Sequence, residues 1–382
     1  MDRTRYESSL FGAARKYGGR HGYDVYFPAK IPRSLALAPE TIRGLGDAEA
    51  SLGRLAGAGR LLPNPHLLVR PYLSREAVAS TRIEGTQASL LELFDAEAAD
   101  VELGADLEEV VNYIRAMELG LGRLAELPLS TRLIREMHQV ILHGVRGREW
   151  QPGQLRRSQN WIGPPGATIE TAPFVPPPPG ELSPLLSDWE RFVHEDPPLP
   201  VLVQAGLLHY QFETIHPFLD GNGRLGRLLI VFFLVDRGRL NEPLLYLSPY
   251  FEANRDAYYA TLQGVRERGD IDAWLQFFLA AVEQQATDAV QRTERLLDLR
   301  ERYRSRVLAA TRSQASVLVD VAFTQPVLTS RVVESRLKVS RPAALRLLRQ
   351  LEELRVLHPA PDGPRGQRRW RASEIIEILT AG

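Results

Sequence analysis

The segment from His216 to Arg227 constrains the local structure more than any other part of the chain. Its residues are His-Pro-Phe-Leu-Asp-Gly-Asn-Gly-Arg-Leu-Gly-Arg, and an apolar stretch, Leu228 to Val235, comes directly after it. A proline disfavours helical geometry at the preceding residue, so Pro217 places His216 on a loop. The two glycines around Asn222 allow left-handed backbone and the close approach of a ligand. The segment therefore predicts a loop and then a helix that starts near Asn222.

The start of this predicted helix is suited to binding an anion. Free backbone N–H groups and the positive end of the helix dipole face a ligand at a helix N-terminus, and phosphate is the usual ligand there. Arg224 and Arg227 are three residues apart, so they share one helix face and can grip a polyphosphate. Taken separately, a histidine, an Asp-Gly-Asn-Gly turn and two arginines are each more often structural. Their combination in one short segment indicates an active site.

The segment resembles the signature of the Fic family, His-x-Phe-x-(Asp/Glu)-Gly-Asn-Gly-Arg-x-x-Arg, and every specified position is filled. The resemblance implies transfer of AMP from ATP to a Ser, Thr or Tyr hydroxyl of a target protein. It implies His216 as the general base and Asp220 as the ligand of a Mg²⁺ ion. It further implies that the remaining residues of the signature bind the phosphates of ATP, namely Gly221, Asn222, Gly223, Arg224, Gly226 and Arg227.

The chemistry of these residue types agrees with that implication. An imidazole with an ordinary pKa of about 6.5 can accept the proton of an incoming hydroxyl at neutral pH. An aspartate offers hard oxygen ligands, which suit a Mg²⁺ ion that also binds phosphate oxygens. We expect the backbone N–H groups of residues 221–223 and the Asn222 side chain to form an anion nest. Arg224 would then hold the β-phosphate region and Arg227 the γ-phosphate.

A stretch rich in proline and glycine, residues 151–180, precedes the signature. Four consecutive prolines at 176–179 exclude a helix or a central strand there. Upstream of them we predict a hairpin with Asn160-Trp161-Ile162 on one arm, residues 167–169 on the other and residues 163–166 as its turn. A disordered surface loop is the alternative. Fic proteins carry a β-hairpin flap at this distance before the signature, and the flap would dock an extended target segment on Asn160, Trp161 and Ile162 through main-chain hydrogen bonds.

The hexapeptide Ser80-Thr81-Arg82-Ile83-Glu84-Gly85 resembles the inhibitory motif of the family, (Ser/Thr)-x-x-x-Glu-(Gly/Asn). The resemblance implies an inhibitory role for Ser80, Glu84 and Gly85. A buried Glu84 paired with Arg227 would occupy the guanidinium that the γ-phosphate needs, because such pairs are strong when desolvated. The alternative is an ordinary carboxylate on a helix surface. The reverse reaction, removal of AMP with Glu84 orienting a water molecule, stays open.

Two tyrosines downstream of the signature, Tyr258 and Tyr259, are candidates for the adenine or ribose side of the nucleotide. The sequence around them resembles the segment downstream of the signature in Fic relatives. The alternative is core packing at helical spacing, which is the favoured interpretation for one of the two. His209 lies on the predicted helix that leads to the signature loop, and we interpret it as structural.

Helical periodicity dominates the rest of the chain, which predicts a mostly α protein. We expect a Fic-type helical core with a β-hairpin flap and a C-terminal winged helix-turn-helix domain. The expected domains are an N-terminal helical segment with the inhibitory motif (1–105), the Fic catalytic core with connector helices (106–300) and the winged helix-turn-helix (301–382). Helices are predicted at residues 40–55, 71–99, 106–126, 130–143, 182–194, 201–213, 252–268 and 271–306.

The C-terminal segment shows the order of a winged helix-turn-helix: a helix at 328–337, a turn, a helix at 341–354 and a two-stranded wing at 358–371. Pro342 fits the first turn of the second helix. From Glu301 onward the chain has fifteen Lys or Arg residues and eight Asp or Glu residues, which suits a phosphate backbone. DNA is therefore a candidate partner, and a nucleotide-sensing transcriptional regulator is an alternative to an enzyme. A winged helix used only for protein contacts is the other alternative.

Composition excludes several kinds of site. The chain has no cysteine, which rules out disulfides, thiolate metal ligands and a cysteine nucleophile. Its 47 basic and 47 acidic residues balance, so net charge predicts no partner. Residues 1–15 lack the apolar core of a signal peptide, and Leu228 to Val235 is too short to cross a bilayer. We expect a cytoplasmic protein without membrane contact, and a homodimer is compatible with its helical surfaces.

Overall fold

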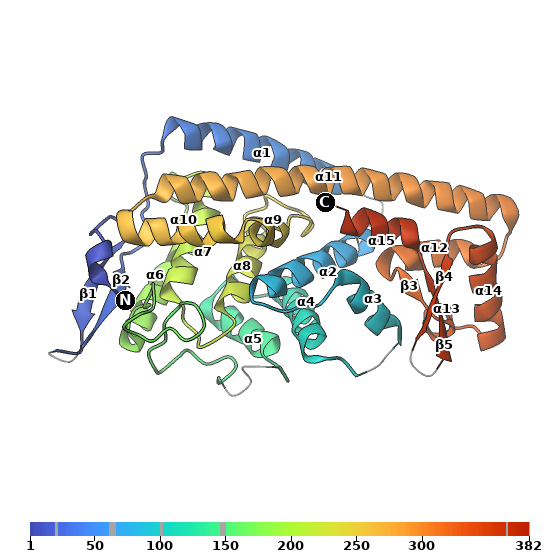
Figure 1. Cartoon of the computed structure of the whole chain (residues 1–382). Coiled ribbons are helices and arrows are strands. Elements are labelled where there is room, and N and C mark those ends of the chain that lie inside the picture. Colours follow the sequence, from blue (N-terminus) through green and yellow to red (C-terminus); the bar gives the residue numbers. More distant parts are fainter. Residues whose placement is uncertain are drawn as a thin grey trace.

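The structure is a computed structural model of the chain, and it describes residues 1–19, 22–60, 66–99, 102–124, 126–145, 150–363 and 366–381. The described part is mostly helical, as predicted, with two small antiparallel sheets (Figure 1). No helix of the described ranges is both long and apolar enough to cross a membrane.

Two long helices run side by side along one edge of the molecule (Figure 1). α1 (Pro39–Arg60) packs against α11 (Ile271–Ala310), which is 40 residues long. The Asp270 side chain caps α11 by accepting a hydrogen bond from the Ala273 N–H. α11 reaches from the catalytic side to the C-terminal segment, so the domain boundary expected at residue 301 falls inside a continuous helix.

The helices that carry the signature form the centre of the core. α7 (Val201–Ile215) and α8 (Asn222–Asp236) pack against each other, and nearly all of their side chains are buried. A helix that is apolar on all sides is a core helix, which explains why both lie in the interior. The helices around this pair are α2 (His66–Ile83), α4 (Ala105–Leu124), α5 (Thr131–Ile141), α6 (Leu182–His194), α9 (Ser248–Ala253) and α10 (Arg255–Arg268).

The single helix predicted at residues 71–99 is wrong, because the chain turns between α2 and α3 (Leu90–Ala99). Gly85 has a φ of 103°, a backbone conformation that favours glycine and ends α2. Ser89 then starts α3 with a reciprocal capping arrangement, in which its N–H and hydroxyl donate to Glu92 and its hydroxyl accepts from the Glu92 N–H. The hexapeptide from Ser80 to Gly85 therefore lies at the C-terminal end of a helix.

The N-terminal segment forms a hairpin that the sequence analysis did not predict. β1 (Gly12–Tyr17) and β2 (Tyr23–Pro28) are antiparallel, with Gly12 opposite Pro28. The backbone N–H of Tyr26 in β2 donates to the Val175 carbonyl at 3.0 Å. The hairpin therefore supports the segment that precedes the signature.

The C-terminal elements are in the predicted order of helix, turn, helix and two strands, with a further helix at each end. The sheet order is β3 (Val327–Leu328), β5 (Gln367–Arg371) and β4 (His358–Gly363), with β5 antiparallel to both neighbours. Lys338 adopts a left-handed φ of 52° in the turn between the two predicted helices. The elements are α12 (Ala315–Thr324), β3 (Val327–Leu328), α13 (Ser330–Leu337), α14 (Arg341–Glu353), β4 (His358–Gly363), β5 (Gln367–Arg371) and α15 (Ser373–Thr380).

This C-terminal unit packs against α2 and α3, the helices on either side of the turn at Gly85 (Figure 1). Asp95 on α3 forms ion pairs with Arg369 at 3.3 Å and Arg371 at 2.6 Å, both on β5. The Thr329 hydroxyl donates to the Ala98 carbonyl at the end of α3. Helices α12 and α15 contact α2 directly.

Candidate active site

The signature loop begins where α7 ends, at His216. This residue leaves the helix directly before Pro217, as predicted, and its backbone is left-handed, with φ 49° and ψ 62°. The buried guanidinium of Arg156 donates to the carbonyls of His216 at 2.8 Å and Ile215 at 3.3 Å. The Arg156 N–H also donates to the Pro217 carbonyl at 3.0 Å. Arg156 therefore holds the loop in a conformation that is otherwise unfavourable for a residue other than glycine.

The His216 side chain is half-buried, and its Nδ1 has no hydrogen-bond partner among the residues that the structure describes. Burial lowers the pKa of His216, and the positive charges of Arg156 and Arg266 lower it further. The imidazole is therefore neutral at neutral pH, which is the form that can accept a proton.

The N-terminus of α8 lies directly after the loop, as predicted. Gly221 caps the helix with left-handed backbone, φ 78°. Asn222 and Gly223 open the helix, so their N–H groups precede the first intrahelical hydrogen bonds. The Asn222 side chain, which we expected in the anion nest, is bonded within the loop. Its amide bonds both backbone groups of Phe218, accepting from the N–H and donating to the carbonyl at 2.9 Å each, and so it ties the loop together.

A histidine that the sequence analysis missed holds the same loop from α5. The Gly153 N–H donates to Nδ1 of His138 at 2.8 Å, so Nε2 carries the proton and donates to the Asp220 carbonyl at 2.9 Å. The ring also stacks on Phe218, with centroids 3.8 Å apart. Burial lowers the pKa of His138 to about 4, which keeps it in this neutral form. No sequence motif marks His138.

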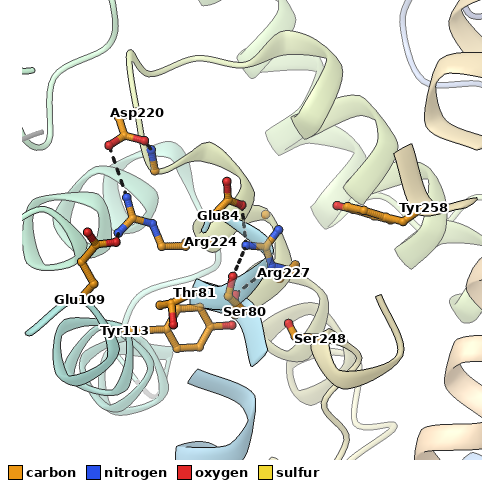
Figure 2. Close-up of polar contacts among 12 residues, drawn as sticks. Ser80, Thr81, Glu84, Glu109, Tyr113, Asp220, Arg224, Arg227, Ser248 and Tyr258 are labelled. Carbon is orange, nitrogen blue, oxygen red and sulfur yellow. Dashed lines mark hydrogen bonds and ion pairs between the residues drawn. The ribbon is translucent and has the colours of Figure 1, made fainter. Parts of the chain in front are cut away.

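Arg224 is buried and paired with two carboxylates (Figure 2). Its Nη1 lies 3.0 Å from Glu109 on α4, and its Nη2 lies 3.4 Å from Asp220. Glu109 is buried too, so the pair is largely desolvated. The Asp220 side chain is 45% exposed, and it also accepts a hydrogen bond from the Gly221 N–H. Glu109 lies outside every motif, and sequence reasoning did not identify it.

Arg227 lies on α8 and reaches the end of α2 (Figure 2). Its Nε donates to the Ser80 hydroxyl at 2.8 Å, and its Nη2 donates to the Ser80 carbonyl at 2.9 Å and to Glu84 Oε1 at 2.7 Å. Burial disfavours the charge of Arg227, but Glu84 and nearby tyrosines outweigh that effect and raise its pKa. The expected pairing of Glu84 with Arg227 is present in the structure.

We expected the Glu84 carboxylate to be buried, but its side chain is 34% exposed. It does occupy the start of α8. A Cβ on Gly223 would lie 2.3 Å from Glu84 Oε1, so the absence of a side chain at Gly223 leaves room for the carboxylate. A negative group at this place interacts favourably with the helix dipole, as a phosphate would.

Two residues expected to bind the nucleotide face the protein interior instead. Gly226 packs against α7, where a Cβ would lie 2.3 Å from Glu213 Oε1, and its carbonyl lies 3.1 Å from His209 Nδ1. Tyr258 is 1% exposed, and its hydroxyl bonds His209 Nε2 at 2.8 Å. Both residues therefore have structural contacts, which for Tyr258 agrees with the core-packing alternative, and their nucleotide contact stays a prediction. Tyr259 is exposed beside Tyr258, and its nucleotide contact stays a prediction.

The segment before the signature pairs differently from the predicted hairpin. Ile162 forms an antiparallel bridge with Phe174, with two main-chain hydrogen bonds of 2.9 and 3.3 Å, and does not pair with residues 167–169. The turn is therefore longer than predicted. Trp161 is exposed, with its Nε1 donating to the Ala167 carbonyl. The Asn160 side chain donates to the Phe218 carbonyl at 3.1 Å, which attaches this segment to the signature loop.

Asp220 would suit a Mg²⁺ ion whose other ligands are phosphate oxygens of a bound nucleotide and water. Asp220 offers one partly exposed carboxylate beside the start of α8. In residues 1–381 as described, no cluster of three or more His, Cys, Asp or Glu side chains could hold a metal alone. Mg²⁺ is commonly bound by one or two carboxylates together with phosphate oxygens and water, which is compatible with this arrangement.

Comparison with curated proteins gives matches over the central part of the chain. This chain is 31% identical over 183 residues to a protein from Drosophila yakuba named protein adenylyltransferase Fic. It is 32% identical over 184 residues to the protein of the same name from Drosophila ananassae. Each match covers 47% of this chain and 32% of the relative. The chain therefore spans about a third of the length of these relatives.

Two solved structures share the fold. A Fic family protein from Desulfovibrio desulfuricans superimposes with a TM-score of 0.57 at 20% identity, covering 88% of this chain and 97% of that one. A Fic domain containing signaling protein from Bacteroides thetaiotaomicron gives a TM-score of 0.52 at 20% identity, covering 66% and 97%. At this identity the likeness concerns the fold alone.

Two regions of the chain match the descriptions of protein families. Residues 42–122 match the Fic/DOC family N-terminal domain, and residues 128–234 match the Fic/DOC family. The first region contains α2 with Ser80 and Glu84, and the second contains the complete signature. With both regions present and in contact through Arg227, residues 42–234 of this chain carry the two adjacent domains of the Fic/DOC family.

Proposed function

We propose that this protein transfers AMP from ATP to a hydroxyl side chain of a target protein. The observation that carries the proposal is the folded signature, in which the loop from His216 leads directly into the N-terminus of α8, and α8 carries Arg227 to the end of α2. The name of the curated relatives, protein adenylyltransferase Fic, supports the same activity. Since the chain spans about a third of those relatives, the activity of the whole protein is part of the proposal.

In this proposal, His216 accepts the proton of the attacking hydroxyl. Its neutral form is available at neutral pH, and a triphosphate bound beside it would raise its pKa, because a nearby negative charge favours the protonated form. The free N–H groups of Asn222 and Gly223 would bind phosphate oxygens, and Arg224 and Arg227 would neutralise their charge. A Mg²⁺ ion held by Asp220 would supply further charge neutralisation when bound.

Glu84 would inhibit this reaction in two ways. It forms an ion pair with Arg227, and its carboxylate fills the place above Gly223 that a phosphate would take. ATP would therefore bind with its phosphates displaced from the geometry that transfer needs. Ser80 would strengthen the inhibition, because its hydroxyl and carbonyl hold the same guanidinium.

The segment around Ile162 would position the target. Its main chain pairs with Phe174 on one side, and an extended target segment would add to its other side through main-chain hydrogen bonds. The exposed Trp161 would contact the residue next to the modified hydroxyl. Replacing Ile162 by Asp should reduce target labelling more than ATP binding.

Labelling with ATP that carries a tag on its α-phosphate tests the proposed function. The full chain, the Glu84→Gly variant and the Glu84→Gly/His216→Ala double variant are incubated in lysate with tagged ATP and Mg²⁺. We expect strong protein labelling by Glu84→Gly, with a mass gain of one AMP, weak labelling by the unaltered chain and none by the double variant. If Glu84→Gly adds no AMP to any protein, or labels equally without His216, the proposal is wrong.

A second candidate function is DNA binding by the C-terminal unit as a winged helix-turn-helix, which the order of its elements and its β3-β5-β4 sheet support. Arg341, Arg346 and Arg349 are exposed on α14, the helix that would enter the major groove. None of the three has an ion pair within the described ranges. A row of free cations on this helix favours contact with phosphates.

Fluorescence anisotropy with the full chain and a labelled duplex tests this candidate. We expect binding that weakens as salt rises, and a smaller salt dependence for Arg346→Ala/Arg349→Ala, because each lost phosphate contact reduces the slope. Arg43→Ala is a matched control, since Arg43 is an exposed arginine on α1, far along the chain from this unit. Equal binding by all three proteins would exclude α14 as the contact.

A further inference from the structure

A carboxylate on α3 attaches the C-terminal unit to the rest of the chain. Asp95 forms ion pairs with Arg369 at 3.3 Å and with Arg371 at 2.6 Å, both on β5. The Asp95 side chain is 19% exposed, and the two arginine side chains are 12% and 22% exposed, so solvent screens these pairs less than pairs on an open surface. The Thr329 hydroxyl adds a hydrogen bond to the Ala98 carbonyl at 3.4 Å, at the end of the same helix. The C-terminal unit is therefore attached to α3 by partly buried polar contacts.

A second attachment joins the end of α15 to α2 through α11. Arg292 on α11 is buried, and its guanidinium donates to the carbonyls of Ile378 and Ala381, at the C-terminal end of α15. Asp288, one turn earlier on α11, accepts from Arg292 at 2.8 Å with each of its oxygens. The same carboxylate lies 3.1 Å from Arg75 of α2. The C-terminal unit is thus linked to α2 as well as to α3.

Helix α2 presents one face to the C-terminal unit and another to the signature. Leu379 and Thr380 of α15 line a cavity of about 500 Å³, and α2 contributes to the same cavity Arg75, Val78, Ala79 and Arg82. These four positions are spaced by three or four residues, as the positions of one helix face are. Ser80 lies on a different face, where it bonds Arg227. A shift of α2 that follows the C-terminal unit would therefore act on the Arg227 contact.

Arg82 connects the cavity face of α2 to the turn that carries Glu84. Its Nε donates to the Ala88 carbonyl at 2.8 Å, beyond the turn, and its Nη1 lies 3.7 Å from Glu252 of α9. Glu84 comes directly after α2, and its N–H donates to the Thr81 carbonyl at 3.0 Å. The position of the Glu84 carboxylate therefore depends on where α2 ends and on the closing of the turn toward α3. Both of these helices carry attachments to the C-terminal unit.

We propose that the docked C-terminal unit restrains α2 and α3, and so helps to keep Glu84 on Arg227. Release of the unit would let the turn at Gly85 open, and Glu84 would leave the guanidinium and the start of α8 more readily. Since coupling between two sites is reciprocal, a ligand that favours the released unit would raise AMP transfer. This inference rests on the proposed AMP transfer, and it assigns the C-terminal unit a part in the inhibition.

Two variants that weaken the attachment to α3 test the inference. Asp95→Asn weakens both ion pairs, and Arg371→Met removes one of them. We expect Asp95→Asn to raise AMP transfer at least about fivefold, the lower end of the range for coupled sites, and Arg371→Met to raise it less. Neither variant should exceed the rate of Glu84→Gly. Added to Glu84→Gly, both should have no further effect, because the inhibition is already removed. Rates of labelling with tagged ATP measure the transfer.

Glu136→Gln is a matched control for Asp95→Asn. Glu136 is also a single carboxylate paired with two arginines, Arg123 and Arg132, at 3.2 Å from each, but it lies on α5. This variant should leave AMP transfer unchanged. Asp95→Glu keeps the charge that holds the two arginines of β5, so it should keep most of the inhibition.

Hydrogen exchange follows the turn without a need for activity. The amides of residues 84–86 donate to carbonyls at the end of α2 at 3.0–3.3 Å, so their exchange rates report how often the turn opens. We expect Asp95→Asn and Arg371→Met to speed the exchange of these amides. Glu136→Gln should match the unaltered chain.

The inference is overturned if Asp95→Asn fails to raise AMP transfer in a chain where Glu84→Gly raises it. It is also overturned if Asp95→Asn raises transfer equally with and without Glu84→Gly, because the effect would then not pass through Glu84. A fall in transfer for both Asp95→Asn and Arg371→Met would show that the contacts support only the fold. Failure of the proposed function looks different, because Glu84→Gly would then transfer no AMP. In that case, unchanged exchange of residues 84–86 in Asp95→Asn still overturns the coupling.

Discussion

The Glu84 carboxylate lies 2.7 Å from Nη2 of Arg227, and it reaches this position from the end of a helix. The left-handed backbone of Gly85 ends α2 directly after Glu84 and turns the chain toward α3. The same carboxylate lies over Gly223, at the start of α8. One side chain therefore engages both the guanidinium and the helix N-terminus that a triphosphate would need.

Weakening the ion pair between Glu84 and Arg227 to different extents should raise the rate of AMP transfer to correspondingly different extents. Glu84→Gly removes the carboxylate and its charge, and Glu84→Gln keeps the shape without the charge. A hydrogen bond to a charged group contributes about 1.5–3 kcal/mol, so we expect Glu84→Gly to raise AMP transfer roughly ten- to hundredfold and Glu84→Gln to raise it less. Rates of labelling with tagged ATP measure the effect. Glu92→Gln, an exposed glutamate on α3, is the control and should match the unaltered chain.

The signature was predictable because its information is local. Pro217 dictates where α7 ends, and the glycines and Asn222 dictate where α8 begins, all within one short segment. The inhibitory motif is also contiguous, and its pairing with Arg227 was expected from the family resemblance. Its helix end was missed, because the periodicity continues past Gly85 and conceals the break.

The residues that hold the signature in place were not predictable, because tertiary contacts alone relate them to it. Glu109 is 115 positions from Arg224, and His138 is 82 positions from Asp220. A single glutamate or histidine on a helix has no local feature that distinguishes a partner from a surface residue. The buried contacts of Gly226 and Tyr258 were not predictable for a related reason, since helical spacing does not reveal which face is buried.

Alanine at Gly226 should destabilise the fold. Its Cβ would lie 2.3 Å from Glu213 Oε1 and 3.3 Å from Phe212, both on the buried face of α7. Overpacking of this kind costs about 1–3 kcal/mol, and we expect the free energy of unfolding to fall by that amount in urea titrations. Gly122→Ala is the matched control, because Gly122 lies on α4 with open space around it. That change should be neutral or stabilise by up to about 1 kcal/mol, and equal losses in both variants would contradict the packing argument.

The contributions of Arg224 and Glu109 to the free energy of unfolding should be coupled. Arg224→Met leaves the buried Glu109 carboxylate without its guanidinium, which typically costs about 3–5 kcal/mol. The double variant Arg224→Met/Glu109→Leu removes both charges, so it should recover most of the loss. Urea unfolding of the two single variants and the double variant gives the coupling energy. Additive losses would show that the pair contributes no interaction of its own.

Acidification should reduce the stability that the buried, neutral His138 contributes to the folded chain. The folded pKa of His138 is lowered to about 4 by burial, whereas an unfolded histidine titrates near about 6.5. Between these values the unfolded chain binds more protons than the folded chain, so the free energy of unfolding falls as pH drops from about 6.5 to about 4. The contribution is fully present above about pH 6.5. His138→Gln does not titrate, so its unfolding temperature should approach that of the unaltered chain as pH falls through this window. A constant difference between the two curves from pH 7.5 to 4 would show that His138 does not titrate on unfolding as its buried position requires.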